Sequence, residues 1–281
     1  MKMNAKRGSG LFEKLLLVAV LFGLAACETV QTTQGGVVGV DRQQKMAISA
    51  GEIEQAATKE YAELIAAAQQ KGLLNRNPGQ VSRVKTIAAR LIQQVPAFRP
   101  DALNWKWETN VLTSSEVNAW CMPGGKIAVY TGLIEKLQLT DDELAAVMGH
   151  EMAHALREHA RERASEQAVA GIGISILSAV AGVGDAGAKI GEYAYMGLIG
   201  LPNSRAHETE ADRIGVELAA RAGYDPRAAV SVWQKMSKYS QSAGKGQPPQ
   251  FLSTHPANDT RIHQIEANLP KVLPLYEKAR P

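Results

Sequence analysis

Two histidines and a glutamate near the middle of this 281-residue chain are spaced for metal chemistry. His150, Glu151 and His154 form the pattern His-Glu-x-x-His within the stretch AAVMGHEMAHALREHARER. On a helix, side chains four residues apart project from one face, so both imidazoles could hold a single metal ion. Zinc is the metal that such a pair usually holds, and Glu151 could handle the protons of a zinc-activated water. The pattern therefore predicts a hydrolytic zinc site.

The residues around this motif predict that it lies on a buried helix. Thr140 and Glu143 form a Thr-x-x-Glu capping box, and Asp141 and Asp142 suit the positive end of a helix. The side chains near the motif are small or apolar: Ala145, Ala146, Val147, Met148, Gly149, Met152, Ala153, Ala155 and Leu156. Two histidines on a solvated helix face are the alternative, but buried histidines need polar partners, and a metal supplies one.

A third ligand must come from elsewhere, because catalytic zinc usually takes three protein ligands and keeps a position for water. The stretch SRAHETEADRIG places Glu208 and Asp212 four residues apart on one helical face. Glu208 could ligate the metal, and Asp212 could accept a hydrogen bond from a ligand histidine. The spacing alone fits a charged surface pair equally well. His159, five residues past His154 and off its face, is expected to be solvated.

The two motifs together resemble a known family of zinc peptidases. MGHEMAH followed by HETEADRIG is similar to the family that includes HtpX, BepA, LoiP and the CAAX prenyl proteases. The resemblance implies a zincin-type (gluzincin) metallopeptidase domain that binds one Zn2+ through His150, His154 and Glu208. It also implies Glu151 as the catalytic base and Asp212 as the residue that orients a ligand histidine.

The resemblance extends to both sides of these motifs, from about Val117 to Arg261. NAWCMPGGKIAVYTGL matches the strand and turn before the zinc helix, and Asn118 there matches a position that binds substrate backbone. STHPANDTRI resembles a late His-Pro motif, which implicates His255 and Arg261 in steadying the oxyanion. His255 would also be able to approach zinc in a resting state. The residues alone leave His255 open as a turn residue ahead of Pro256.

The start of the chain predicts export and lipid attachment. A basic beginning leads into the apolar run LLLVAVLFGL and then LAAC, which resembles a bacterial lipobox ending at Cys27. Residues 1–26 would be a lipoprotein signal peptide, with a plain secretory signal as the alternative. Residues 27–42 are expected to be a flexible tether. Glu28 differs from the aspartate that resembles a retention signal, so a lipid anchor in the outer membrane, facing the periplasm, is favoured.

The remaining pattern predicts one α+β domain over residues 43–281, mostly helical, with a small antiparallel sheet. Strands are expected at 103–108, 116–121 and 126–130, and helices at 43–70, 81–94, 140–167, 205–222, after 225, and at 258–267. Residues 168–201 are rich in Gly, Ala and Ile. They are expected to form an apolar lid or hairpin over the site, with a membrane helix as the alternative.

The charge of the chain bears on nucleic-acid binding, and its cysteine content bears on disulfide bonds. The chain has 31 basic and 28 acidic residues, and those beyond residue 26 balance. A nucleic-acid partner is therefore not expected. With Cys27 lipidated, Cys121 has no cysteine to pair with and is expected to be a small buried side chain.

These features predict a lipid-anchored zinc endopeptidase of the bacterial envelope that cuts unfolded or misassembled proteins. The substrate chain would add to the sheet edge near residues 118–130 through main-chain hydrogen bonds, a mode that reads backbone more than sequence. The alternative is a zinc-containing lipoprotein that assists outer-membrane proteins, or their assembly machinery, without cutting. A two-metal small-molecule hydrolase is disfavoured because the sequence shows no second cluster of ligands.

Overall fold

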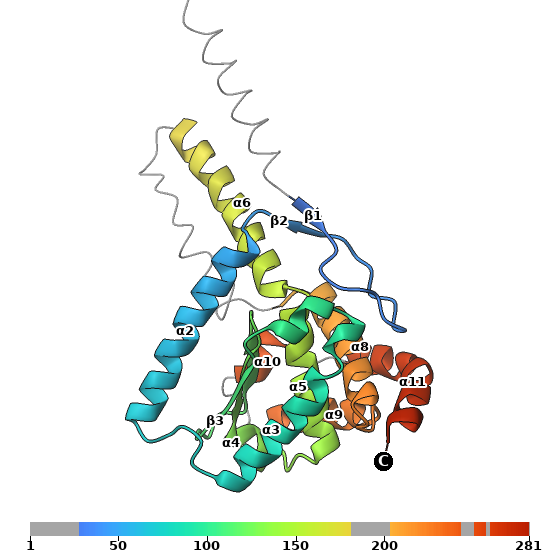
Figure 1. Cartoon of the computed structure of the whole chain (residues 1–281). Helices are drawn as coiled ribbons and strands as arrows, with labels where there is room; N and C mark the ends of the chain where they lie inside the picture. Colours follow the sequence, from blue (N-terminus) through green and yellow to red (C-terminus); the bar gives the residue numbers. More distant parts are fainter. Residues whose placement is uncertain (1–27, 181–202, 243–249, 257–258, 281) are drawn as a thin grey trace, which may run out of the picture.

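The computed structural model describes residues 28–180, 203–242, 250–256 and 259–280 (Figure 1). Its longer helices are α2 (Ala50–Gln70), α3 (Pro78–Ile92), α5 (Asp141–Leu156), α6 (His159–Val180), α8 (Arg205–Arg221), α9 (Ala228–Ser242) and α11 (Asp259–Ala279). Its shorter helices are η1 (Val95–Ala97), η2 (Pro100–Asn104), α4 (Thr131–Lys136) and α10 (Gln250–Thr254). Its strands are β1 (Glu28–Val30), β2 (Gln44–Met46), β3 (Glu108–Leu112), β4 (Ala119–Met122) and β5 (Lys126–Tyr130). The predicted class, mostly helical with a small sheet, is confirmed.

Helix α5 runs through the centre of the domain and carries the His-Glu-x-x-His motif. The predicted capping box is present: the Thr140 hydroxyl accepts a hydrogen bond from the Glu143 amide, and the Glu143 carboxylate accepts one from the Thr140 amide. Nearly every residue of α5 is buried, with α8, α9, α3 and β4 packed around it. A helix enclosed in this way holds its side chains in fixed positions.

Helices α5 and α8 approach each other backbone to backbone at two glycines. A Cβ atom at Gly149 would lie 2.8 Å from the carbonyl oxygen of Gly215, and one at Gly215 would lie 2.7 Å from the amide nitrogen of His150. Only glycine leaves room for this crossing. The crossing brings the acidic face of α8 directly against the histidines of α5.

The main sheet has the strand order β3-β5-β4, with β5 at its centre. The β4–β5 hairpin is antiparallel as expected, and its turn uses Gly124 and Gly125 at φ angles of 77° and 81°. Strand β3, however, pairs with β5 in parallel, which differs from the expected all-antiparallel sheet. The chain leaves β3, crosses to the far side of β5 and only then forms β4. Strand β4 consequently occupies an edge.

The strand expected at 103–108 is wrong, and β3 begins only at Glu108. Pro100 starts a short 3-10 helix that ends at Asn104, followed by a loop in which the rings of Trp105 and Trp107 stack 5.5 Å apart. The Trp107 indole also donates a hydrogen bond of 2.8 Å to the Ala102 carbonyl. The alternation of apolar and polar residues here comes from a pair of stacked rings, not from a pleated strand.

The flexible tether expected at residues 27–42 is also wrong for residues 28–42, which pack onto the domain. Val38 and Val40 are buried, and the Val38 amide donates a hydrogen bond of 3.1 Å to the Glu217 carboxylate on α8. Strand β1 pairs antiparallel with β2, which occupies the first residues of the helix expected at 43–70. That helix starts at Ala50, where Ser49 and Glu52 form its own capping box. A polar, glycine-containing composition did not reveal this packing.

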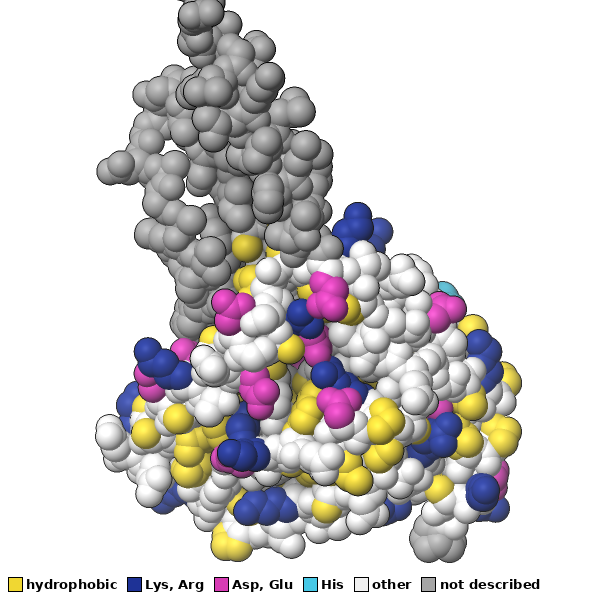
Figure 2. All heavy atoms as spheres, turned by 45° about the horizontal axis from the view of Figure 1, so that its top comes forward, with side chains coloured by type: hydrophobic (Ala, Val, Ile, Leu, Met, Phe, Trp, Pro, Cys, Tyr) yellow, Lys and Arg dark blue, Asp and Glu magenta, His cyan; other side chains and the backbone are white. Residues whose placement is uncertain are grey.

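The single helix expected at 140–167 is wrong: α5 ends at Leu156, Glu158 has a φ angle of 52°, and a separate helix begins at His159. The other boundaries lie near those expected, and two of them extend further. Helix α11 reaches Ala279 despite Pro270 and Pro274, and α6 carries the chain as helix to Val180. The rest of the segment expected to be a lid, from residue 181, lies outside the described residues, as do the signal peptide and Cys27. Among the described helices, none is both long and apolar enough to cross a bilayer. On the face shown in Figure 2, basic and acidic side chains of the described residues are interspersed.

Candidate metal centre and active site

The structure brings the three predicted metal ligands together. The Nε2 atoms of His150 and His154 lie 3.1 Å apart. The Glu208 carboxylate from α8 places Oε1 3.3 Å from His154 Nε2 and Oε2 3.5 Å from His150 Nε2. Ligands about 2.0–2.1 Å from a tetrahedral zinc ion lie about 3.3–3.4 Å from one another. The spacing of these donor atoms therefore fits zinc.

His255, which follows α10, joins the same cluster. Its Nδ1 atom lies 2.9 Å from Glu208 Oε1 and 3.3 Å from His150 Nε2. Its Nε2 atom lies 3.5 Å from Glu151 Oε1. The structure thus places His255 between the ligand set and the predicted base, whereas the sequence alone left it open as a turn residue.

Asp212 and Arg261 support the cluster from behind. Asp212 Oδ1 lies 3.0 Å from Nδ1 of His150, the ring atom opposite the metal-facing one. Arg261 donates two hydrogen bonds of 2.7 Å to Asp212, and its Nη1 atom lies 2.6 Å from Glu208 Oε2. The guanidinium also covers the face of the Trp233 ring. In this structure Arg261 holds the carboxylates of two helical turns; the oxyanion role stays a prediction.

The charges in the cluster suit a cation. Burial opposes ionisation of Glu208, but the His255 charge and hydrogen bonds from His154 and His255 hold the pKa of its carboxyl well below the usual range. Burial lowers the pKa of His154 well below the usual range, so its imidazole is neutral, the form that binds metal. An ionised carboxylate and a neutral imidazole are the donors that zinc requires.

Glu151 faces a cavity of about 260 Å³ beside the cluster. Burial raises the pKa of its carboxyl, while the His255 and His150 charges act in the opposite direction. Asn118, Trp120, Tyr130 and Arg163 line the same cavity. A glutamate opening onto a cavity beside the metal ligands has the position that a base for hydrolysis needs.

The edge strand β4 forms one wall of this cavity. The cavity lining follows the chain from Asn118 through Met122 to Pro123. The Asn118 carbonyl accepts a hydrogen bond of 3.1 Å from Tyr130, and its side-chain oxygen accepts one from Ala119. The structure therefore places Asn118 in the lining of the cavity, directly before the edge strand. Its role in binding substrate stays a prediction.

Cys121 is a free thiol on β4 and is buried, as the sequence predicted. Burial raises the pKa of this thiol well above the usual range, which keeps it in the unreactive protonated form.

Sequence reasoning missed a second polar cluster beside the first one. Within the described parts of the chain, two groups of side chains have donor atoms close enough to hold a metal ion. The second consists of His159, Glu162 and His207, all buried, so the expectation of a solvated His159 is wrong. The sequence did contain a signal for this second cluster. His159 and Glu162 closely follow the zinc motif, and His207 directly precedes Glu208, so all three residues had to lie near the metal ligands. His207 and Glu210 lie on the side of this second cluster, since His207 Nε2 is 3.1 Å from Glu162 Oε2 and Glu210 Oε2 is 3.1 Å from His159 Nε2.

Comparison with known proteins identifies the class to which this fold and site belong. The model of peptidase family M48 matches residues 78–269, which is more than half of the chain. The chain therefore belongs to peptidase family M48, a family of metallopeptidases. The matched range contains all the ligands and supporting residues described above, which confirms the family resemblance seen in the two motifs.

Particular relatives agree with this class. The chain is 33% identical over 178 residues to the mitochondrial metalloendopeptidase OMA1 of Saccharomyces cerevisiae, covering 62% of this chain and 50% of that protein. It is 33% identical over 216 residues to the mitochondrial metalloendopeptidase OMA1 of Bos taurus, covering 73% and 40%. It is 28% identical over 190 residues to the beta-barrel assembly-enhancing protease of Yersinia pestis, covering 64% and 37%. The chain spans half or less of the length of these relatives.

Proposed function

We propose that this protein is a zinc-dependent endopeptidase of the bacterial envelope that hydrolyses peptide bonds in unfolded or misassembled proteins. The observation that carries the proposal is the convergence of His150, His154 and Glu208 at zinc-ligand spacing, with Glu151 facing the adjoining cavity. Membership of family M48 and relatives named metalloendopeptidases support the same chemistry.

Each residue of the site has a definable part in this reaction. When bound, zinc would polarise the scissile carbonyl and lower the pKa of the attacking water. The Glu151 carboxylate takes a proton from that water and delivers it to the leaving amine. His255 lies close enough to Glu151 and the ligands to donate a hydrogen bond to the oxyanion as negative charge develops on it.

The edge strand supports an extended polypeptide as the substrate. Strand β4 has β5 on one side, and its other side faces the cavity that holds Glu151. A peptide added along β4 would form main-chain hydrogen bonds that depend little on its sequence. This mode suits unfolded chains, and the named activity of the Yersinia relative, a beta-barrel assembly-enhancing protease, supports envelope proteins as the substrate class.

The envelope location rests on the first residues of the chain. The apolar run followed by Leu24-Ala25-Ala26-Cys27 supports a lipid anchor on Cys27. The domain begins to pack at Glu28, so the anchor would hold it directly at the membrane surface. Fractionation of cells that express Cys27→Ala tests this part, because the anchor predicts release of the protein from membranes.

Casein hydrolysis by the purified protein, wild type against Glu151→Gln, tests the catalytic proposal. The substitution removes the base but leaves the three ligands, so we expect hydrolysis to fall by about 10²- to 10⁴-fold while zinc content stays the same. Glu166→Gln changes an exposed glutamate of α6 outside the cluster, so it is the control and should hydrolyse casein like the wild type.

Measuring hydrolysis together with zinc content distinguishes the endopeptidase from the non-catalytic zinc lipoprotein. Hydrolysis that persists in zinc-replete Glu151→Gln would rule out the assigned base. A wild type that binds zinc and suppresses aggregation of unfolded outer-membrane proteins, yet cuts none of them, would instead favour the non-catalytic lipoprotein.

A further inference from the structure

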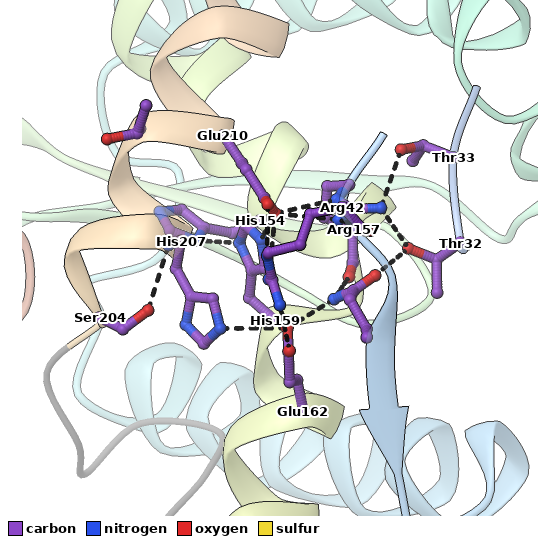
Figure 3. A network of polar contacts seen from close by, with 12 residues as sticks. Thr32, Thr33, Arg42, His154, Arg157, His159, Glu162, Ser204, His207 and Glu210 are labelled. Atoms are coloured by element: carbon purple, nitrogen blue, oxygen red, sulfur yellow. Dashed lines mark hydrogen bonds and ion pairs between the residues drawn. The ribbon is translucent and has the colours of Figure 1, made fainter. Parts of the chain in front are cut away.

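A buried polar network lies directly behind His154, the second histidine of the proposed zinc site (Figure 3). It joins the end of α5, the start of α6, the face of α8 and the N-terminal segment 28–46. Its first contact is a hydrogen bond of 2.8 Å between the Nδ1 atoms of His154 and His159. We propose that His159 is a positioning residue for the zinc ligand His154, and that Glu210 fixes His159 in turn. This inference rests on the zinc site of the proposed function.

The direction of each hydrogen bond follows from zinc binding. His154 faces the other ligands through Nε2, so in the zinc-bound protein its Nδ1 atom carries the proton and must donate. His159 Nδ1 must then accept, which places the ring proton of His159 on Nε2. That Nε2 atom lies 3.1 Å from Glu210 Oε2, where a carboxylate accepts it. One chain of donors thus leads from the metal site to Glu210.

The same principle already operates at the other histidine. The Nδ1 atom of His150 meets Asp212 directly, and Arg261 fixes that carboxylate. A carboxylate behind a zinc-bound imidazole fixes its tautomer and ring orientation. At His154 the carboxylate is further away, and the imidazole of His159 bridges the gap.

Two arginines hold Glu210 in place. Arg157, at the end of α5, donates to Glu210 Oε2 at 3.1 and 3.0 Å. Arg42, in the N-terminal segment, donates to both oxygens of Glu210 and also binds both oxygens of Glu162. Figure 3 shows the side chains of Arg42, Arg157 and Glu210 gathered near His154 and His159. The segment after the predicted lipid site therefore takes part in ordering the metal centre.

A second metal ion is the other use that this cluster allows, but its contacts oppose it. Glu162 accepts hydrogen bonds from Arg42 at 2.6 and 2.9 Å and from Gln44 at 2.7 Å. A cation bound by Glu162 would have to displace the guanidinium, and Arg157 would add further positive charge. The existing partners satisfy the carboxylate, so hydrogen bonding is the favoured role.

His207 provides a matched control for His159. Both are buried, both lie beside a glutamate at 3.1 Å, and their rings stack 4.3 Å apart. Of these two histidines, His159 is the one whose hydrogen bond to His154 the structure shows. A merely structural histidine should therefore behave alike at both positions, whereas a positioning residue should affect zinc binding only at position 159.

The test measures the zinc dissociation constant by competition with a chromophoric chelator, together with zinc stoichiometry. For His159→Leu we expect zinc affinity to weaken about 10- to 100-fold. For His207→Leu we expect a change of less than about threefold, with one zinc per chain in the wild type. Equal weakening in both variants, or no weakening in His159→Leu, would overturn the proposal. Two zinc ions in the wild type and one in both variants would assign the cluster as a metal site instead.

A second measurement needs no variant. In the zinc-loaded wild type, nitrogen NMR of the histidine rings should show His159 neutral with its proton on Nε2. A proton on Nδ1 would contradict the chain of donors. Neither measurement depends on peptidase activity, so the inference can fail while the proposed function stands. A wild type that binds no zinc would instead remove the proposed function.

Discussion

At the scale of single residues, the site is built from charges that are buried and paired. Arg261 is the clearest case, because one guanidinium binds both oxygens of Asp212 and reaches Glu208 as well. Asp212 in turn lies against the ring of His150. The sequence motif identified all of these residues, but it could not show that Arg261 faces the carboxylates, since that depends on where α11 packs.

Replacing Arg261 with lysine tests this pairing. A single ammonium group cannot bind both carboxylates in the same geometry, so one buried charge loses its partner. We expect the free energy of unfolding to fall by about 1–3 kcal/mol and zinc affinity to fall roughly tenfold. Urea unfolding with and without zinc measures both effects.

Arg227 provides the control, because it forms a similar pair with Asp225 on the surface, where 62% of its side chain is exposed. Arg227→Lys should change the free energy of unfolding by less than about 1 kcal/mol. Equal losses in the two variants would mean that the pairing at Arg261 has no special role.

At the scale of elements, the patterns with strong local causes were predictable and those set by distant packing were not. The capping box at Thr140 and the apolar run after it fixed the start and the burial of α5. The parallel pairing of β3 depends on the route the chain takes across the sheet, and stacked tryptophans imitated a strand at 103–108. His159 looked solvated because one continuous helix was expected there. The chain instead breaks at Glu158, with a φ angle of 52°, which turns His159 toward His154, and the packing of α8 brings Glu210 to it.

The glycine crossing of α5 and α8 makes a prediction at this scale. In Gly215→Ala the new methyl group would meet the backbone of His150, so the helices must separate. We expect a loss of about 1–3 kcal/mol in the free energy of unfolding, with weaker zinc binding because Glu208 moves away from the histidines.

Gly51→Ala is the control for Gly215→Ala, because Gly51 also lies in a helix, α2, but has open space around it. It should leave zinc binding unchanged and raise the free energy of unfolding by up to about 1 kcal/mol. Unaltered zinc affinity in Gly215→Ala would show that the close crossing does not set the ligand geometry.

At the scale of the whole molecule, the N-terminal segment is part of the domain and not a tether. It packs Val38 into the core and extends Arg42 to the network behind His154. Composition alone could not reveal this, because the segment has few apolar residues and its partners on α6 and α8 lie more than 100 positions further along the chain.

Substitutions at two neighbouring valines test whether the N-terminal segment is packed into the domain or is a tether. Val38 is 1% exposed and Val37 is 43% exposed. In Val38→Asp, a charge would be buried beside the Glu217 carboxylate, so thermal unfolding should show a loss of about 3 kcal/mol or more. In Val37→Asp the loss should stay below about 0.5 kcal/mol. A true tether would tolerate both substitutions.

We propose that one zinc ion binds between α5 and α8, held by His150, His154 and Glu208. An anomalous difference map from crystals of the zinc-loaded protein, collected at the zinc edge, tests it most directly. We expect one peak, about 2.0–2.1 Å from Nε2 of both histidines and from a Glu208 oxygen. A map whose zinc peak lies among His159, Glu162 and His207, with none between the α5 histidines and Glu208, would contradict it.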